Sequence, residues 1–215
     1  MSLTIEGCMR LVKFLAVVLV FMAGTRFSHG QSTLITFDGQ ATNTAVSVQS
    51  YSEGGILFSP IGSMTPGNTF TRVGSMGPLA QAENGTAYVR AGQGQSLSFS
   101  FTNGSVFSLN SVDLAEYSTV VGGTATVHFV GYFANGSTIV QDLTTDGIID
   151  GTGPITDFQT FTFRGWDNLT RVEIPTYGWS LDNLVVTPLP EPGTIGLGVL
   201  GVAALYLARR KPRQN

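Results

Sequence analysis

Apolar and polar residues alternate with a period of two through residues 31–187, and short clusters rich in Gly, Asn and Asp interrupt the alternation. Successive residues of a strand face opposite sides of a sheet, so this pattern predicts half-buried strands, and no part of the segment has a helical period. Interruptions roughly every 8 to 12 residues are typical of all-β domains. We expect about ten strands, at 33–37, 55–59, 86–90, 96–102, 106–117, 124–133, 137–143, 158–164, 169–174 and 179–187.

The strand expected at 124–133 is followed by Asn135-Gly136 and then by a second alternating run at 137–143. Asn-Gly between two alternating runs is the strongest short-range signal of a β-hairpin, because these residues readily adopt positive φ. One face of the first strand is apolar, and His128 and Tyr132 lie on the other. The segment therefore predicts an antiparallel hairpin with one face in the core.

Large apolar residues are spread over the whole of 31–187, which predicts one core and one domain. No period of about 20 to 50 residues repeats, so solenoids and propellers are disfavoured. About ten strands are enough for two packed sheets. We therefore predict an all-β fold, an antiparallel β-sandwich of jelly-roll-like form, between a signal-peptide helix and a transmembrane helix.

Residues 1–30 carry the pattern of a secretory signal peptide. Arg10 and Lys13 precede an apolar run at 14–23, and small and polar residues follow it. This order of basic, apolar and small residues is typical of export signals that are removed in the mature protein. Met9 stands directly before the basic pair, so we expect it to be the true start.

The C-terminal segment 188–215 consists of three parts. Pro190-Glu191-Pro192 is followed by an apolar stretch at 193–208 and by a basic end at 209–215 that contains Arg209, Arg210, Lys211 and Arg213. As a helix the apolar stretch is about 24 Å long, slightly short of a bilayer core of about 30 Å. A transmembrane helix with this basic end in the cytoplasm places 31–190 outside the inner membrane.

This tail resembles the PEP-CTERM sorting signal of Gram-negative bacteria, and the resemblance covers Thr187 to Arg213. It implies an exosortase as processing partner, with cleavage near Pro190-Glu191-Pro192. It also implies a passage through the inner membrane with the ectodomain outward, and then release to the cell surface or an extracellular matrix. A plain tail anchor behind a proline-rich spacer is the alternative interpretation.

Charge and cysteine content exclude several classes of function. Residues 31–190 contain four Arg, no Lys and twelve Asp or Glu, a formal net charge of −8. Such a domain repels phosphate backbones and anionic lipid surfaces, so a nucleic-acid partner is excluded. The only cysteine, Cys8, lies in the predicted signal peptide, so no disulfide is expected in the mature domain.

The first and last predicted strands, around 34–39 and 179–187, resemble the opening and closing strands of jelly-roll domains in PEP-CTERM proteins and carbohydrate-binding modules. In the latter, an Asp of the closing strand often helps to hold a structural calcium, and Asp182 occupies that position. Asp146 and Asp150 in a Gly-rich acidic segment are a weaker calcium candidate. Asp before Gly is also common in ordinary turns, and Asp182 can instead cap backbone amides. No cofactor is expected to be required.

Exposed aromatic rings can stack on the apolar face of a sugar. The candidates for such glycan stacking are Tyr132, Trp166, Tyr177 and Trp179. Tryptophans in loops between strands also close the end of a sandwich, so packing is the alternative for these residues.

We predict no catalytic residue. His128 is the only histidine of residues 31–190, which excludes multi-histidine zinc sites, and no Gly-x-Ser-x-Gly elbow is present. With twelve acidic residues over surface loops, the chance of an accidental pair is high, so paired carboxylates do not by themselves indicate glycoside hydrolysis.

The sequence thus favours a secreted, non-catalytic surface or extracellular-matrix protein of a biofilm type, sorted through its C-terminal tail, with extracellular polysaccharide as a further partner. The first alternative is a carbohydrate-binding module with a defined glycan site. The second is a glycan-cleaving enzyme of the same fold.

Overall fold

A computed structural model describes residues 30–40, 46–61, 70–73, 82, 84–118, 123–149, 157–189 and 201. The predicted signal peptide up to residue 29, the sorting motif and the basic end lie outside these residues, as does the predicted transmembrane segment apart from residue 201. Within the described part of the chain, no helix has both the length and the hydrophobicity needed to cross a membrane.

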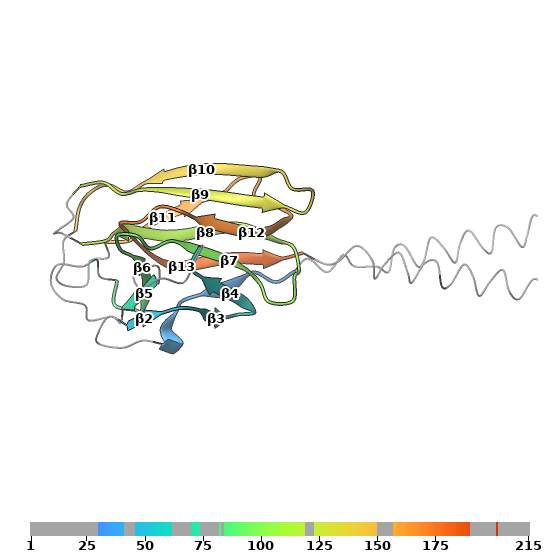
Figure 1. Ribbon diagram of the computed structural model, residues 1–215, viewed down its shortest axis with the longest axis horizontal. Coiled ribbons are helices and arrows are strands. Elements are labelled where there is room, and N and C mark those ends of the chain that lie inside the picture. The colour runs from blue at the N-terminus through green and yellow to red at the C-terminus, as the bar shows by residue number, and fades with distance from the viewer. Residues whose placement is uncertain are drawn as a thin grey trace, which may run out of the picture.

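The described strands form two antiparallel sheets that lie face to face (Figure 1). The first sheet contains, in spatial order, β2 (Val46–Val48), β5 (Phe70–Val73), β6 (Tyr88–Ala91), β13 (Trp179–Pro188), β8 (Phe107–Glu116) and β11 (Gln159–Thr162), with β1 (Thr33–Ile35) beside the second half of β13. The second sheet contains β3 (Tyr51–Glu53), β4 (Ile56–Ser59), β7 (Leu97–Phe101), β12 (Leu169–Ile174), β9 (Thr126–Phe133) and β10 (Thr138–Thr144).

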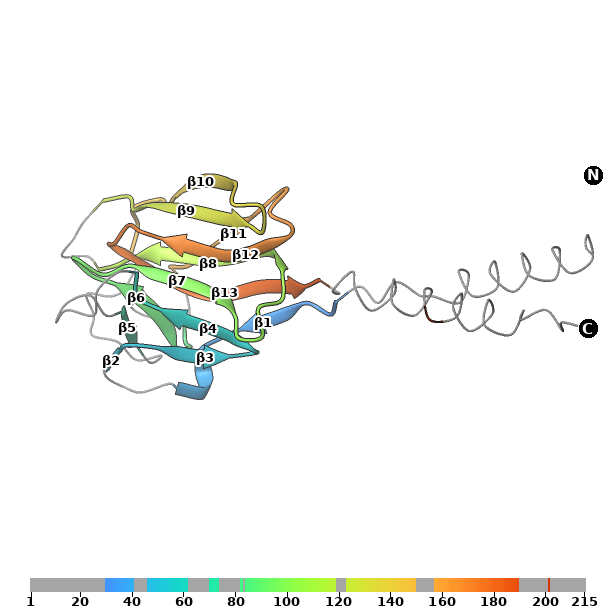
Figure 2. The same ribbon diagram turned by 45° about the vertical axis from the view of Figure 1, so that its right-hand side comes forward.

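Backbone pairing passes from one sheet to the other at a single residue pair, Leu169 with Phe107. A short 3-10 turn, η1 (Asp38–Gln40), follows β1. The two layers are seen again when the molecule is turned, and their strands run along the long direction of the domain (Figure 2). This arrangement confirms the predicted antiparallel β-sandwich.

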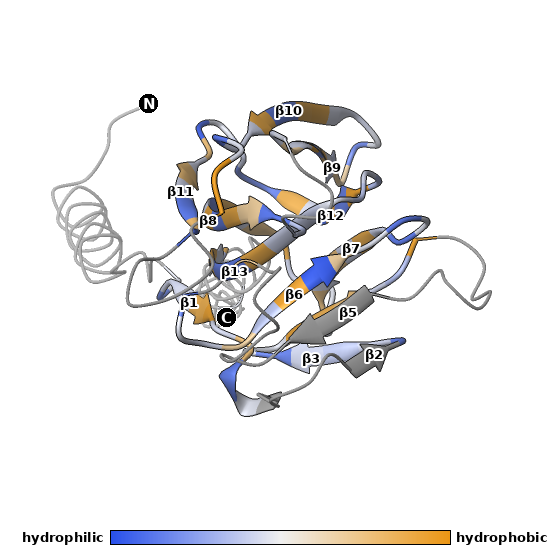
Figure 3. Cartoon of the chain, turned by 90° about the vertical axis from the view of Figure 1, so that its left-hand side faces the viewer, coloured by the Kyte–Doolittle hydropathy of each residue, from blue (hydrophilic) through white to orange (hydrophobic). Residues whose placement is uncertain are grey.

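One apolar core fills the space between the two sheets, and both sheets contribute alternate residues to it. Leu114 and Leu181 come from the first sheet and Phe58, Phe99 and Phe129 from the second, all with 2% or less of their surface exposed. Burial of each such side chain contributes about 1.5 to 3 kcal/mol. Figure 3 shows the resulting alternation of hydrophobic and hydrophilic residues along the strands.

All ten predicted strands are present, with ends that differ by at most a few residues. The structure adds β2, β3 and β5, three short strands that were not predicted from the alternation. The predicted hairpin is confirmed as β9 and β10, with Tyr132 opposite Thr138 and with Gly136 at φ 84° in the turn. Phe158 departs from the expected single core, because it packs with Tyr88, Ala82 and Ala115 in a small separate cluster.

Gly131 on β9 is required by the packing of the core. A Cβ atom at this position would lie 2.9 Å from side-chain atoms of Trp166, Leu169 and Ile139. The Trp166 ring packs at the same place against Phe163, with ring centroids 4.9 Å apart. The absence of a side chain on β9 therefore makes room for the indole ring.

The two ends of the domain lie side by side. Residues Thr33 and Val186 are paired across β1 and β13, and Gly30 approaches the backbone of Pro188. The segments before residue 30 and after residue 189 therefore connect to the same end of the sandwich.

Candidate binding face on the second sheet

The outer face of the second sheet is formed by the residues that alternate with its core positions. On β9, Val127 and Phe129 are buried in the core, so His128 and Tyr132 face outward. The strand register then sets Arg171 of β12 beside Tyr132. This places side chains from β9 and β12 on one solvent-facing surface, as the alternation of β9 predicts.

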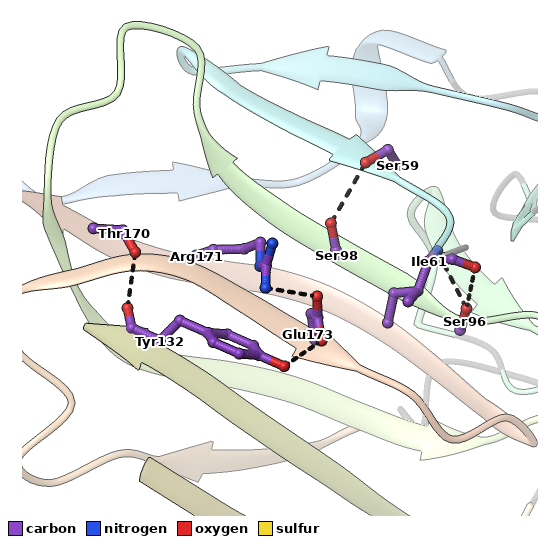
Figure 4. Close-up of polar contacts among 8 residues, drawn as sticks. All are labelled: Ser59, Ile61, Ser96, Ser98, Tyr132, Thr170, Arg171 and Glu173. Atoms are coloured by element: carbon purple, nitrogen blue, oxygen red, sulfur yellow. Dashed lines mark hydrogen bonds and ion pairs between the residues drawn. The ribbon is translucent and has the colours of Figure 1, made fainter. Parts of the chain in front are cut away.

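Tyr132, Arg171 and Glu173 form a closed cluster on this face (Figure 4). The Tyr132 hydroxyl donates a 2.6 Å hydrogen bond to Oε2 of Glu173, and Nη2 of Arg171 lies 3.1 Å from Oε1 of the same carboxylate. The Arg171 guanidinium lies over the Tyr132 ring, 4.2 Å from the ring centroid. Each of the three side chains therefore contacts the other two, which restricts their rotamers before any ligand arrives.

The cluster is open to solvent, and within it the positive charge of Arg171 offsets the negative charge of Glu173. The side chain of Arg171 is 46% exposed and that of Glu173 is 17% exposed. The hydrogen bond to Glu173 raises the pKa of Tyr132 above its ordinary value, with desolvation and the charge of Glu173 as further causes. The phenol therefore stays a hydrogen-bond donor at neutral pH, and the partly exposed guanidinium carries five N–H donors.

Serine hydroxyls continue the polar surface across the neighbouring strands. Ser98 on β7 is paired with Glu173, and its Oγ lies 3.5 Å from Oγ of Ser59 on β4. Ser96 accepts a 3.3 Å hydrogen bond from the amide of Ile61 (Figure 4). With strands about 4.8 Å apart, the surface from β9 to β4 spans about 14 Å.

His128 and Asp142 form a second polar pair on the same face. They lie near the start of β9 and the end of β10, away from the turn that joins the two strands. Nδ1 of His128 lies 2.5 Å from Oδ1 of Asp142. The two residues are directly opposite in the strand register. This confirms the interpretation of His128 as a residue of the sheet face.

The four aromatic candidates for glycan stacking have different surroundings. Trp166 is 2% exposed and Trp179 is 0% exposed, and both belong to the core. Neither ring has a free face for a sugar, so the stacking prediction is wrong for these two residues, and packing explains them. Tyr177 is 56% exposed, and Tyr132 is half-buried with Arg171 over its ring. Tyr132 alone belongs to the cluster described above.

Asp182 lies at the centre of a buried hydrogen-bond network in the first sheet. Its Oδ2 accepts from Nδ2 of Asn84 at 2.6 Å and from the Thr86 hydroxyl at 2.9 Å, and Oδ1 accepts from the amide of Asn183 at 2.7 Å. The residue is 0% exposed. Burial raises the pKa of Asp182 from 3.8 to about 7, although these hydrogen bonds act to lower it.

The local backbone explains why Asp182 points into this network. Asn183 has φ 47°, and the register of β13 against β8 shifts directly after Asp182. Nδ2 of Asn183 donates to Oδ2 of Asp113 at 2.8 Å, which holds the irregularity against β8. Before this point β13 pairs with β6, and after it β13 pairs with β1. The bulge thus marks the place where the strand changes its neighbour.

A second carboxylate lies near Asp182. The charge of Asp38 contributes to the raised pKa of Asp182, and Oδ1 of Asp38 accepts a 3.2 Å hydrogen bond from the amide of Ala87. The carboxylates of Asp38 and Asp182 are oxygen ligands of the kind that Ca²⁺ takes, whereas the amide oxygen of Asn84 already accepts from the amide and the hydroxyl of Thr86. Across the described ranges, however, no three His, Cys, Asp or Glu side chains gather in one place.

The weaker calcium candidates do not join this network. Asp146 is exposed, and its Oδ1 accepts from the amide of Ile148 at 2.9 Å, which is the hydrogen bond of an ordinary turn. Asp150 lies outside the described residues.

Sequence reasoning missed Arg171 and Glu173, and it missed Asn84 and Thr86 as partners of Asp182. Arg171 and Glu173 are two residues apart on a predicted strand, so the alternation rule already placed them on one face. No signal in the sequence linked them to Tyr132, because the contact requires β9 and β12 to be neighbours.

Comparisons with known proteins give only distant likenesses. No protein-family model and no curated protein matches the chain. A family 11 carbohydrate-binding module from Clostridium thermocellum, solved with a mixed-linked tetrasaccharide, has a TM-score of 0.30 and 12% identity over 76% of this chain and 99% of that chain. The family 32 module of NanJ from C. perfringens, solved with galactose, has a TM-score of 0.33 and 13% identity over 73% of this chain and 99% of that one. These scores are too low to assign the chain to either family.

Proposed function

We propose that this protein is an exported, non-catalytic β-sandwich that binds neutral polysaccharide through the outer face of its second sheet. The observation that carries the proposal is the solvent-facing cluster of Tyr132, Arg171 and Glu173. A guanidinium, a carboxylate and a phenol held in fixed orientation offer planar donors and acceptors to sugar hydroxyl groups. The guanidinium covers one face of the tyrosine ring, so the planar group offered to a sugar on that side is the guanidinium itself.

The size and charge of the surface support a particular class of ligand. The serines of β7 and β4 extend the polar surface by about 14 Å from β9, which suits a short stretch of a chain better than a single sugar. A net charge of −8 over residues 31–190 opposes the approach of anionic polymers. The ligand expected here is therefore an uncharged glycan chain of the cell surface or its matrix.

The proposed route of export rests on the sequence at the two ends. A signal peptide at residues 1–30 and the tail resembling a PEP-CTERM signal at residues 188–215 support passage through the inner membrane, exosortase processing and delivery to the cell surface or matrix. Mass spectrometry of the protein from its native host tests this route. A species that begins near Gln31 and ends near Pro190 supports sorting, and one that retains residues 193–215 in the inner membrane contradicts it.

A glycan panel tests the binding face directly. The full chain is expected to bind at least one uncharged polysaccharide, and Arg171→Ala is expected to weaken that binding at least about tenfold, because the charged hydrogen bonds are lost. Arg164→Ala is the matched control, since Arg164 is also an exposed arginine but lies outside the cluster.

Three results would contradict the proposal. They are no binding across the panel at millimolar concentration, equal loss of binding in both arginine variants, and release of reducing ends from the bound polysaccharide. The last result would favour a glycan-cleaving enzyme.

A further inference from the structure

The strand β10 forms a long edge of the second sheet. Its seven residues, Thr138–Thr144, pair only with β9 among the strands that the structure describes, and no register shift interrupts that pairing. Figure 3 shows β10 at the outer edge of its layer. The other edge strands, β2, β3 and β11, are three or four residues long. Length alone therefore makes β10 the edge most suited to further pairing.

The edge of β10 lacks the features that normally prevent strand pairing. It contains no Pro and no Lys, and no charged residue faces the core side. Val140 is 59% exposed, and the one charge of the strand, Asp142, is already bound by His128 of β9. Natural edge strands are commonly protected by charges, prolines, bulges or short length.

The turn of the hairpin fixes which backbone groups of β10 face outward. The amide of Phe133 donates to the carbonyl of Ser137 at 2.9 Å, so this pair is hydrogen-bonded. Bonded and non-bonded pairs alternate along an antiparallel ladder. Residues 139, 141 and 143 therefore direct their N–H and C=O groups to β9, and residues 138, 140, 142 and 144 direct theirs away from the sheet.

The sequence of the strand is partly symmetric about Gln141. Reading outward from that residue, Ile139 is matched by Leu143 and Thr138 by Thr144, whereas Val140 stands against Asp142, a pair of unlike residues. If two copies pair antiparallel about Gln141, all seven residues overlap. The same register brings the outward-facing residues opposite one another as hydrogen-bonded pairs. Threonine then faces threonine, and the two apolar residues share the core side, both of which are favourable cross-strand pairs.

We propose that the protein forms a two-fold symmetric dimer through β10, in which the strand pairs with β10 of a second copy in the register centred on Gln141. A shared edge with a two-fold axis is self-complementary and closes after two copies. The two-fold axis of an antiparallel pair is perpendicular to the sheet, so both outer faces lie on the same side of the dimer. The inference stands on the backbone edge and does not require glycan binding. If both proposals hold, two binding faces on one surface add avidity for a long polysaccharide.

Disulfide cross-linking tests the register. Cys8 is replaced by Ser in the full chain, and Gln141→Cys is introduced, because residue 141 would face its own copy across a non-hydrogen-bonded pair. Oxidation of the chain in mild detergent is expected to give a covalent dimer on a non-reducing gel. Thr162→Cys on the short edge strand β11 is the matched control, since Thr162 is exposed. A Gln141→Cys chain that oxidises no faster than the control would overturn the proposal.

A charge pair at Val140 tests the same register without cysteine. Val140→Asp sets two acidic residues opposite each other on both sides of the central Gln141 pair, and it is expected to weaken dimerisation about tenfold in sedimentation. Val140→Lys sets a lysine opposite Asp142 and is expected to dimerise at least as well as the unmodified chain. Because Val140 is exposed, both variants should keep the fold of the monomer, which circular dichroism at a concentration too low for dimerisation checks. A parent chain that sediments as a monomer at about 100 μM, or equal weakening by both variants, would contradict the register.

Discussion

The middle of the first sheet and the outer face of the second contain the same kinds of side chain in opposite surroundings. In the first sheet, β13 carries Trp179 and Asp182, and both are 0% exposed. In the second sheet, Tyr132 and Glu173 form an aromatic and acidic pair that faces solvent together with Arg171. In both places a carboxylate accepts hydrogen bonds from side chains far away in the sequence, Asn84 and Thr86 for Asp182 and Tyr132 for Glu173.

The difference in burial decides what each group can do. The carboxylate of Asp182 accepts hydrogen bonds from the side chains of Asn84 and Thr86. These bonds join β13 to the segment before β6. Around Glu173, the side chain of the partner Arg171 is 46% exposed, so its guanidinium is accessible from solvent. The buried set therefore contributes to folding, and the open set is available to a ligand. Four experiments test this contrast.

The aromatic residues provide the largest contrast. Trp179→Ala is expected to lower the free energy of unfolding by about 4 kcal/mol, because a fully buried indole leaves a cavity. Tyr177→Ala, two residues earlier, is expected to change it by less than about 0.5 kcal/mol, because its ring is more than half exposed. Urea denaturation followed by fluorescence measures both. Similar losses of stability in the two variants would contradict the placement of Trp179 in the core and of Tyr177 at the surface.

The two carboxylates provide the second contrast. Asp182→Ala leaves the donors of Asn84, Thr86 and Asn183 without an acceptor, and we expect a loss of about 3 kcal/mol of stability. Glu173→Ala removes contacts at the surface, where water replaces them, and a loss below about 1 kcal/mol is expected. Chemical denaturation of both variants measures their free energies of unfolding. An equal loss of stability would mean that the outer cluster also contributes to the stability of the fold.

Stability is expected to depend on pH through Asp182. Its pKa is raised from 3.8 to about 7 in the folded protein, so the folded state binds the proton more tightly than the unfolded state. The contribution of protonated Asp182 to the free energy of unfolding is fully present below about pH 4. It declines as the pH rises to about 7, by at most about 1.4 kcal/mol per pH unit. Asp182→Asn should remove this decline. Thermal unfolding of the parent and the variant at several pH values measures this. Identical profiles would show that Asp182 does not cause the pH dependence of stability.

The smallest expected effect concerns calcium. The sequence predicts Ca²⁺ at Asp182, and Asp38 is the second carboxylate whose charge acts on it, so a cation bound by both would offset their repulsion. Millimolar Ca²⁺ is expected to raise the free energy of unfolding by about 1 kcal/mol. Asp38→Asn should abolish the increase, while Asp146→Asn should leave it unchanged. The absence of any shift in the melting temperature at millimolar Ca²⁺ would rule out the site.

The fold was largely readable from local pattern, and the binding face only in part. Alternation located ten strands and the β9–β10 hairpin, because period-two patterning and Asn-Gly act over a few residues. The same rule put Tyr132 on an outer face. It could not distinguish Trp179 from Tyr177, since both follow Thr176 within three residues and only the path of β13 carries one of them into the core.

The sequence by itself determined the class of fold, the acidic character of the domain and the faces of its longer strands, because these depend on composition and on neighbours along the chain. Strand order decided the rest. β9 lies beside β12 across 41 residues of sequence between Tyr132 and Glu173, and Asn84 meets Asp182 across 98. Contacts of that separation depend on which strands become neighbours when the two sheets close on one core, and no local pattern contains that information.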